Sequence, residues 1–98
     1  MFVRLTYISI YPDKVEEAKR IFYDEIVPVV KQQRGIRSIM LLEPTTDADD
    51  YISFTSWDNI IDAREYEASD KYKELVRKIR STFSKQAIVK SFKVNKGI

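Results

Sequence analysis

The sequence predicts an α+β domain of the ferredoxin-like class, in which a four-stranded antiparallel sheet packs against two helical regions in the order βαββαβ. Segments with the period-two pattern of strands alternate along the chain with segments whose apolar residues recur every three or four positions. A short polar loop joins the two central strand segments, which indicates an antiparallel hairpin. A chain of 98 residues has the length of one compact domain, so we expect a single domain over residues 1–98.

The first strand and the first helix are predicted on either side of Pro12. Residues 2–11 are rich in β-branched and aromatic side chains and end at this proline, which cannot donate a hydrogen bond to a neighbouring strand. Asp13 is expected to cap the helix, because Glu16 follows three residues later in a capping-box arrangement. Apolar residues then recur on one helical face: Val15, Ala18, Phe22, Ile26 and Val29.

Two residues are expected to shape the end of this helix. Pro28 lacks a backbone N–H and presses on the carbonyl of Asp24, so we predict a kink there, with the helix continuing to about Gln33. Gly35 is expected to adopt the left-handed conformation that ends a helix. The next strand is predicted over residues 36–43 and is followed by the polar loop TTDADD.

The second half of the chain predicts a strand over residues 51–57, two helical pieces and a last strand. Asp58 or Asn59 can cap the first piece, and Ser69 can cap the second. The second piece keeps helical spacing of its apolar residues: Tyr72, Leu75, Val76, Ile79 and Phe83. Residues 87–94 have the alternating pattern of a last strand.

The strand predicted over residues 51–57 has two faces of different character. Ile52 and Phe54 share one face, which we expect to be core. The other face carries a polar and aromatic set: Tyr51, Ser53, Thr55 and Trp57. With both helices on one side of the sheet, the opposite side would be an exposed patch on a monomer, so we expect a second copy to cover it. If two sheets pack face to face, the polar and aromatic set lines a cavity inside the homodimer.

The composition excludes several classes of chemistry. The chain has no histidine and no cysteine, which excludes haem ligation by these residues, conventional zinc sites and the usual Ser-His and Cys-His nucleophile pairs. The aspartates of TTDADD could hold a hard cation, but this loop lacks the glycine and the terminal glutamate of a calcium-binding loop, so a solvated hairpin connection is favoured. We therefore expect no metal and no cofactor. Because no apolar run has membrane-spanning length and the first residues do not resemble a signal peptide, a cytoplasmic protein without a membrane partner is expected.

Positive charge is concentrated near the C-terminal end of the chain. Residues 71–98 carry nine Lys or Arg residues against one Glu, although the net charge of the whole chain is only +2. Such a segment could attract phosphates or acidic ligands. Arg77, Lys78 and Arg80 also fit the solvated side of an amphipathic helix, and this interpretation is favoured over a nucleic-acid surface.

Two long segments of the chain resemble a known family. PDKVEEAKRIFYDEIVPVVKQQRGIRSIMLLEP and YISFTSWDNIIDAREYEASDKYKEL are similar to antibiotic biosynthesis monooxygenase (ABM) domains, small proteins of the dimeric α/β-barrel superfamily. The shared features include a late proline in the first helix, a glycine before the second strand and a hairpin strand that ends in tryptophan. The resemblance covers nearly the whole chain and implies a homodimer of ferredoxin-like subunits. Part of the family oxidises aromatic substrates to quinones without a cofactor, and another part degrades haem.

Single positions match this family only in part. Trp57 stands where the family has its characteristic tryptophan, which the resemblance places beside an aromatic substrate, while packing as core is an equally supported interpretation. The active-site asparagine and tyrosine of quinone-forming members fall on Ser53 and Ala63. The asparagine and the proximal histidine of haem-degrading members fall on Thr6 and Glu67, and without any histidine haem degradation is disfavoured.

The chemistry that remains is the oxidation of a phenolic, hydroquinone or polyketide-like aromatic substrate by O₂, in a cavity between the sheet and the helices of a dimer. An electron-rich phenolate can reduce oxygen directly, so the protein has to supply a pocket and remove the phenolic proton. Trp57 and Arg4 are the candidate catalytic residues, with Arg4 stabilising the phenolate; an exposed or ion-paired Arg4 is the favoured alternative. The candidate substrate-binding residues all carry hydroxyl groups: Thr6, Tyr51, Ser53, Thr55 and Tyr66.

Two other functional classes remain open. The departures from the family pattern at Ser53 and Ala63 favour a non-catalytic dimer that binds a small molecule or has a structural role. The RNA-recognition module has the same strand order, but residues 51–57 lack the glycine and the interleaved aromatic residues of its RNP1 motif. Nucleic-acid binding is therefore disfavoured, and the expected partners are a second copy of the chain and a small aromatic molecule.

Overall fold

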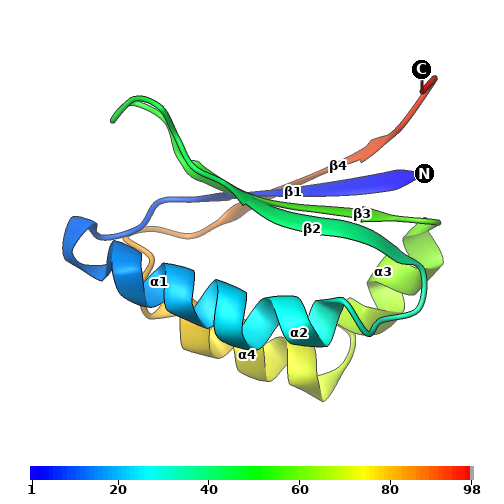
Figure 1. Ribbon diagram of the computed structural model, residues 1–98, viewed down its shortest axis with the longest axis horizontal. Coiled ribbons are helices and arrows are strands. Elements are labelled where there is room, and N and C mark those ends of the chain that lie inside the picture. Colours follow the sequence, from blue (N-terminus) through cyan, green and yellow to red (C-terminus); the bar gives the residue numbers. More distant parts are fainter. Residues whose placement is uncertain (98) are drawn as a thin grey trace.

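The structure, a computed structural model that describes residues 1–97, is a two-layer arrangement of one sheet and several helices. Strands β1 (Phe2–Ile8), β2 (Ile36–Leu42), β3 (Tyr51–Trp57) and β4 (Ile88–Lys93) form an antiparallel sheet in the order β2-β3-β1-β4. The helical elements are η1 (Pro12–Lys14), α1 (Val15–Ile21), η2 (Phe22–Ile26), α2 (Val27–Val30), α3 (Ile60–Glu67) and α4 (Asp70–Arg80). Figure 1 shows that all of them lie on one side of the sheet. The predicted ferredoxin-like class is confirmed.

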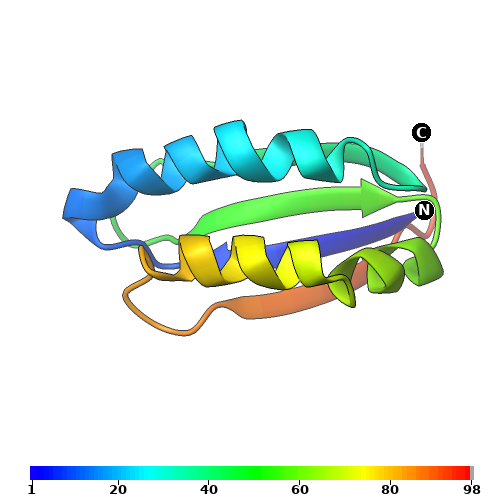
Figure 2. The ribbon, with the colours of Figure 1, turned by 90° about the horizontal axis from the view of Figure 1, so that it is seen from below.

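The helices leave one edge of the sheet uncovered. Seen from the helix side in Figure 2, α1, η2 and α2 form one row along the sheet and α4 forms a second row beside it. Strand β4 lies beyond α4 in this view, and every residue of β4 is exposed. The space beneath α4 therefore lies close to an open edge of the sheet.

The two helices after β3 begin with the predicted capping residues, but the first helix begins without the predicted cap. The side chain of Asn59 accepts a hydrogen bond from the Asp62 backbone N–H at 3.0 Å, and the Ser69 hydroxyl accepts one from the Tyr72 N–H at 3.1 Å. Asp13, which we expected to be the N-cap of the first helix, lies inside the η1 turn. Helix α1 starts after Lys14 with no side-chain cap, because the proline-led turn already fixes the backbone that the capping box would have shaped.

Pro28 disturbs the first helix in a specific way. The turn that precedes it, η2, has the wider hydrogen-bonding pattern of a π-helix, which follows from the backbone hydrogen bond that proline cannot donate. The regular helix then ends at Val30 and not near Gln33, since the next residues form tighter turns such as the Gln33 N–H bond to the Val30 carbonyl at 3.0 Å. The first strand is also shorter than expected and ends at Ile8.

Gly35 has the left-handed backbone that we predicted, with φ at 80°. Its carbonyl accepts a hydrogen bond from the Asp58 N–H at 2.7 Å, which ties the start of β2 to the end of β3. A Cβ atom at this position would lie 2.1 Å from Oδ2 of Asp62. Both the φ angle and the space therefore require glycine here.

Strand β3 directs its polar and aromatic set toward the helices. Directly opposite residues of antiparallel strands point to the same side of a sheet, and Trp57 stands opposite Phe2. Both of these side chains pack against residues of α2 and α3. Ser53 and Thr55, which alternate with Trp57, therefore lie under the helices of their own chain, and not between two facing sheets as we expected.

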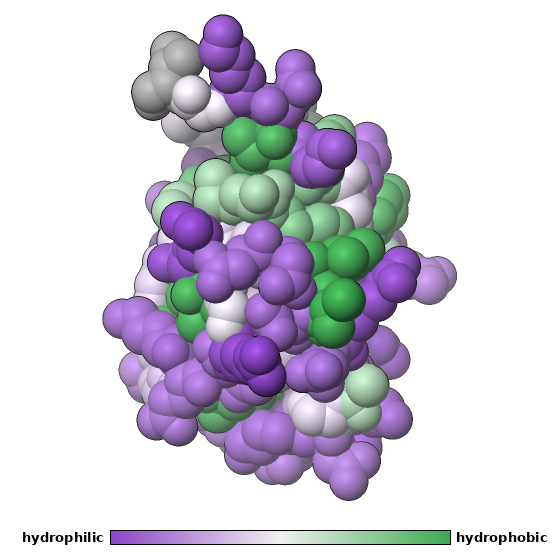
Figure 3. Space-filling view, turned by 90° about the vertical axis from the view of Figure 1, so that its right-hand side faces the viewer, coloured by the Kyte–Doolittle hydropathy of each residue, from purple (hydrophilic) through white to green (hydrophobic). Residues whose placement is uncertain are grey.

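The face of the sheet without helices is mainly apolar, although Lys90 and Ser56 also lie on it. Ile52 and Phe54, which we expected to be core beneath the helices, lie on this face, so our assignment of the two faces was wrong. The large side chains of this face that are 40% to 53% exposed are Met40, Leu42, Ile88 and Phe92. In Figure 3, which views the end of the molecule where the termini lie, green surface occurs mainly in the upper and middle parts, and the lower part, on the helix side, is mostly purple.

Replacing Gly35 with alanine is expected to lower the free energy of unfolding by about 1–2 kcal/mol or more. The left-handed backbone is unfavourable by about this amount for an L-residue, and the new methyl group also clashes with Asp62. Urea denaturation measures the change. Gly97→Ala is the control, since a Cβ atom there meets nothing within 4 Å. Equal stability of the two variants would contradict the account of this turn.

Candidate active site

A cavity of about 680 Å³ lies between the sheet and the helices. Strands β1 and β3 contribute its polar floor, and η2, α2 and α4 contribute apolar side chains. The cavity exists because Ser53 and Thr55 are too small to fill the space that large apolar side chains would occupy at the centre of a packed core. The apolar residues around this space include Phe22, Ile26, Val30, Leu75, Ile79 and Phe83.

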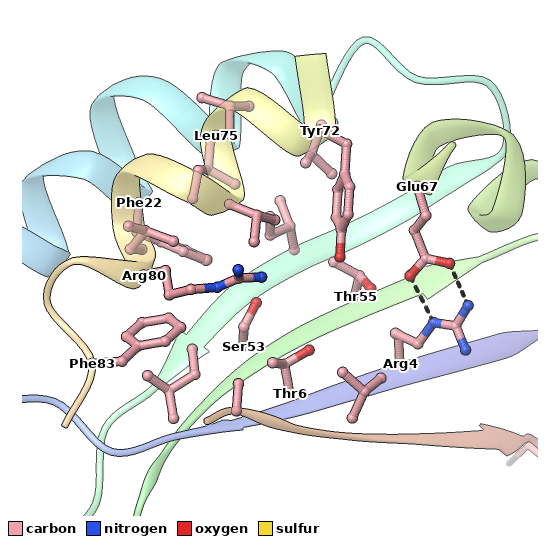
Figure 4. Close-up of a pocket in the computed structure, with 18 of the residues that line it drawn as sticks. Arg4, Thr6, Phe22, Ser53, Thr55, Glu67, Tyr72, Leu75, Arg80 and Phe83 are labelled. Atoms are coloured by element: carbon pink, nitrogen blue, oxygen red, sulfur yellow. Dashed lines mark hydrogen bonds and ion pairs between the residues drawn. The ribbon is translucent and has the colours of Figure 1, made fainter. Parts of the chain in front are cut away.

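Several polar groups point into this cavity, as Figure 4 shows. Thr6 and Ser53 rise from the sheet, and the hydroxyl of Tyr72 reaches down from α4 toward Thr55. The guanidinium of Arg80 extends along the cavity above Ser53. The ion pairs formed within residues 1–97 do not include Arg80, so the described part of the chain offers it no carboxylate.

Arg4 is an ion-paired residue. Its Nε donates to Oε2 of Glu67 at 3.0 Å, and Nη2 donates to Oε1 of the same carboxylate. The remaining nitrogen, Nη1, donates to the Ser91 hydroxyl on β4, and the guanidinium lies 5.0 Å from the centre of the Phe2 ring. This bidentate contact joins β1 to the end of α3. The alternative that we favoured for Arg4 was an exposed cation or an ion pair with a carboxylate on a neighbouring strand, and the structure instead places its partner on a helix.

Two tyrosines in the cavity wall are protonated donors at neutral pH. Burial raises the pKa of Tyr66 to about 12, with smaller contributions from neighbouring Tyr72 and Glu67. Burial also raises the pKa of Tyr72, as does the negative charge of Glu67, while Arg4 and Arg80 act in the opposite direction. The two rings contact each other edge to face, with centres 5.2 Å apart. Neither phenol can act as a base near pH 7.

Trp57 forms part of the cavity wall and is almost completely buried, with 2% of its surface exposed. Its indole N–H donates to the Thr55 hydroxyl at 3.0 Å, and its ring stacks on Tyr66 at a centre-to-centre distance of 5.9 Å. The indole thus offers a flat apolar surface, while its one polar group is already bonded. This geometry suits a wall for an aromatic ligand and leaves no group for acid-base chemistry.

The remaining predicted site residues separate into two places. Thr6, Ser53, Thr55 and Tyr66 line the cavity under the helices. Tyr51 does not; it borders a second depression, formed with the β2–β3 loop and Lys19, at the opposite end of β3. In residues 1–97, no group of three or more His, Cys, Asp or Glu side chains could hold a metal ion, and no helix is long and apolar enough to cross a membrane.

A sequence profile described as antibiotic biosynthesis monooxygenase matches residues 1–78 of the chain. The chain belongs to the ABM family. A search of curated protein sequences gives no significant match.

Solved structures share the fold at low sequence identity. SnoaB, a cofactor-independent oxygenase from Streptomyces nogalater whose mutant form was solved, superposes with a TM-score of 0.86 at 12% identity, covering 99% of this chain and 95% of that chain. Rv0793 from Mycobacterium tuberculosis gives a TM-score of 0.82 at 17% identity, with 98% and 96% of the two chains covered. At such identities these similarities establish the fold of this ABM-family chain, but they do not show the roles of individual residues.

Six polar residues that line the cavity were not predicted from the sequence: Glu67, Tyr72, Arg80, Ser84, Lys85 and Gln86. Arg80 follows Tyr72 by eight positions, which is close to two helical turns, so helical spacing could have placed both on the cavity side of α4. Glu67 falls at the position where haem-degrading ABM members have their proximal histidine, and this correspondence could have placed it at the cavity. Ala63, at the position of the tyrosine of quinone-forming members, is instead buried in the core beside Trp57.

An absorbance titration of the six tyrosines is expected to show one phenol that ionises near pH 12, and Tyr66→Phe should remove this component. Because the pKa of Tyr66 is higher in the folded chain than in the unfolded chain, the stability it contributes is fully present below about pH 10 and is lost as the pH rises through 12. Titration of all six tyrosines near pH 10 in the folded protein would contradict the burial of Tyr66.

Proposed function

We propose that the chain is a cofactor-independent monooxygenase that oxidises a phenolic, hydroquinone or polyketide-like aromatic substrate in the cavity between the sheet and the helices. The observation that carries this proposal is the cavity itself. Its volume of about 680 Å³ lies within the usual range of small-molecule sites. Trp57 and Phe22 offer aromatic contacts for a flat ring, and Tyr72 and Arg80 supply polar contacts for its oxygen.

The polar groups fit the charge that this oxidation develops. A phenolate is the electron-rich form that reacts with O₂, and a nearby cation favours it over the neutral phenol. Arg80 has no acidic partner in the described residues, so its charge is available for this purpose, whereas the charge of Arg4 is already balanced by Glu67. We therefore assign to Arg80 the stabilising role that the sequence suggested for Arg4, with Tyr72 donating a hydrogen bond to the same oxygen.

The overall reaction needs no other reductant. The substrate loses two hydrogen atoms and gains one oxygen atom, and the second atom of O₂ leaves as water. The electrons come from the aromatic ring, so a pocket with the right charges is sufficient. Membership of the ABM family and the similarity to a cofactor-independent oxygenase support this class of reaction over a purely structural role.

We propose further that the active form is a homodimer whose contact surface is the open face of the sheet. The exposed apolar side chains of this face would otherwise form a large patch in water. A second copy that covers them with its own open face makes a closed two-fold dimer. The two cavities then lie on the outer sides of the paired sheets, one under the helices of each subunit.

Oxygen uptake with dihydroxynaphthalenes, anthrones and hydroquinones tests the oxidation. We expect saturable uptake above spontaneous autoxidation, and Arg80→Gln should lower kcat/KM by at least about tenfold, equivalent to roughly 1.4 kcal/mol of lost stabilisation of the transition state. Arg77→Gln is the matched control, because this arginine lies on the same helix outside the cavity. Uptake no faster than the blank with every compound would favour the non-catalytic alternative.

Light scattering tests the dimer. The chain has a mass of 11.6 kDa, and we expect twice this mass at micromolar concentration. Phe92→Lys should shift the protein toward monomer, because it places a charge on the open face. Ile61→Lys, which changes a more exposed apolar residue on α3, should leave the mass unchanged. A monomer for the unmodified chain would rule out the proposed assembly.

A further inference from the structure

We infer that Glu67 is the catalytic base of the proposed oxidation and takes the phenolic proton while Arg4 holds its carboxylate in place. The inference rests on the proposed function, because a phenol must lose its proton before it can reduce O₂ efficiently. It adds a residue and a step that neither the family nor the similar structures assign to this chain.

The residues that line the cavity offer one proton acceptor. Its charged and titratable side chains comprise two arginines and a lysine, two tyrosines, and the carboxylate of Glu67. The arginines and the lysine are cations that have no lone pair to accept a proton. Tyr66 and Tyr72 hold their own protons, because burial raises the pKa of both phenols. Glu67 is the only carboxylate among the lining residues, so the proton can pass either to Glu67 or directly to solvent.

The carboxylate of Glu67 is held in position by Arg4, which is itself held by two further contacts. Arg4 holds both oxygens of Glu67 through Nε and Nη2, and the guanidinium is held in turn by Ser91 and by the face of the Phe2 ring. Each carboxylate oxygen accepts one of these hydrogen bonds and keeps a further acceptor site. In Figure 4 the pair stands at the end of the cavity, on the same side as the Tyr72 hydroxyl. A base held in this way needs no reorganisation when the substrate arrives.

The ion pair also explains how a carboxylate could deprotonate a much weaker acid. When the proton moves to Glu67, the negative charge moves to the substrate oxygen and stays near the Arg4 guanidinium, which loses its carboxylate partner and gains a phenolate. Arg80, at the other side of Tyr72, adds a second positive charge. The total charge in the cavity does not change during the transfer, so the cost that burial normally places on a new charge is small.

The steps balance in atoms and electrons. The phenolic O–H bond breaks, an O–H bond forms on Glu67, and the electron pair stays on the substrate oxygen. The phenolate reduces O₂, and a C–O bond forms at a ring carbon that still carries its hydrogen. The resulting peroxide takes the proton back from Glu67. Loss of the ring hydrogen as a proton then breaks the O–O bond and releases water, which leaves the quinone and a carboxylate ready for the next cycle.

The test compares Glu67→Gln with the native chain across pH. The groups that face Glu67 are Arg4 from β1, Tyr66 from its own helix and Tyr72 from α4. Tyr66 and Tyr72 keep their protons between pH 6 and 9, because burial raises the pKa of both phenols. A change of rate in this range therefore reports on the removal of the substrate proton. We expect kcat/KM of the variant to fall about 100-fold at pH 7. The loss should shrink as the pH approaches the pKa of the free phenol, about 10, because solvent then removes the proton.

Glu65→Gln is the matched control, since it removes the same charge from an exposed position on the same helix. A variant that loses activity equally at every pH would show a purely structural role for Glu67 and would overturn the inference. Activity equal to that of the native chain would overturn it as well. In both cases the native chain still takes up oxygen, so the proposed oxidation would stand.

A second measurement uses the native chain alone and does not depend on turnover. A nitrophenol is added at a pH just below its own pKa, in weak buffer, and its ionised form is followed by visible absorbance while an indicator dye follows proton release. We expect the bound nitrophenol to be ionised with no proton released, because Glu67 retains the proton. Release of one proton for each ionised molecule, binding of the neutral form or no binding would each overturn the inference, whatever the result with oxygen.

Discussion

The alternation of side chains along β3 is the constraint on which the site depends. Every second residue of this strand points under the helices, and at the centre of the sheet these residues are Ser53 and Thr55. Two small hydroxyl side chains do not fill the space beneath η2 and α4. Trp57 lies at one end of the strand with its ring stacked on Tyr66. A cavity with a polar floor and apolar walls follows directly from this order of residues.

The charges around the cavity are distributed unequally, and this distribution favours a ligand that becomes negative. Arg4 and Glu67 cancel each other at one end, in a pair held by hydrogen bonds from two strands and a helix. Arg80 brings a positive charge for which the described chain supplies no carboxylate. A ligand that becomes negative while bound therefore gains more than a neutral one. Two protonated tyrosines complete the set, since both can donate a hydrogen bond to a substrate oxygen and neither competes for its proton.

The sequence predicted the features that depend on neighbouring residues. Asn59 and Ser69 cap their helices, and Gly35 has the expected left-handed backbone, because each of these depends on a few adjacent positions. The assignment of the two faces of β3 was wrong. The alternation of side chains along a strand shows that its two faces differ, but it does not show which face the helices cover. The ion pair between Arg4 and Glu67 could not be predicted from the sequence, because the two residues are 63 positions apart and only the folded chain brings them together.

The central claim is that an aromatic substrate binds under the helices, and a crystal structure of the protein with a bound dihydroxynaphthalene tests it most directly. We expect the rings to lie in the cavity against Trp57, with one hydroxyl within hydrogen-bonding distance of Glu67 or Tyr72. Binding on the open face of the sheet, or in the depression beside Tyr51, would contradict the account and would leave the polar floor of the cavity without an assigned role.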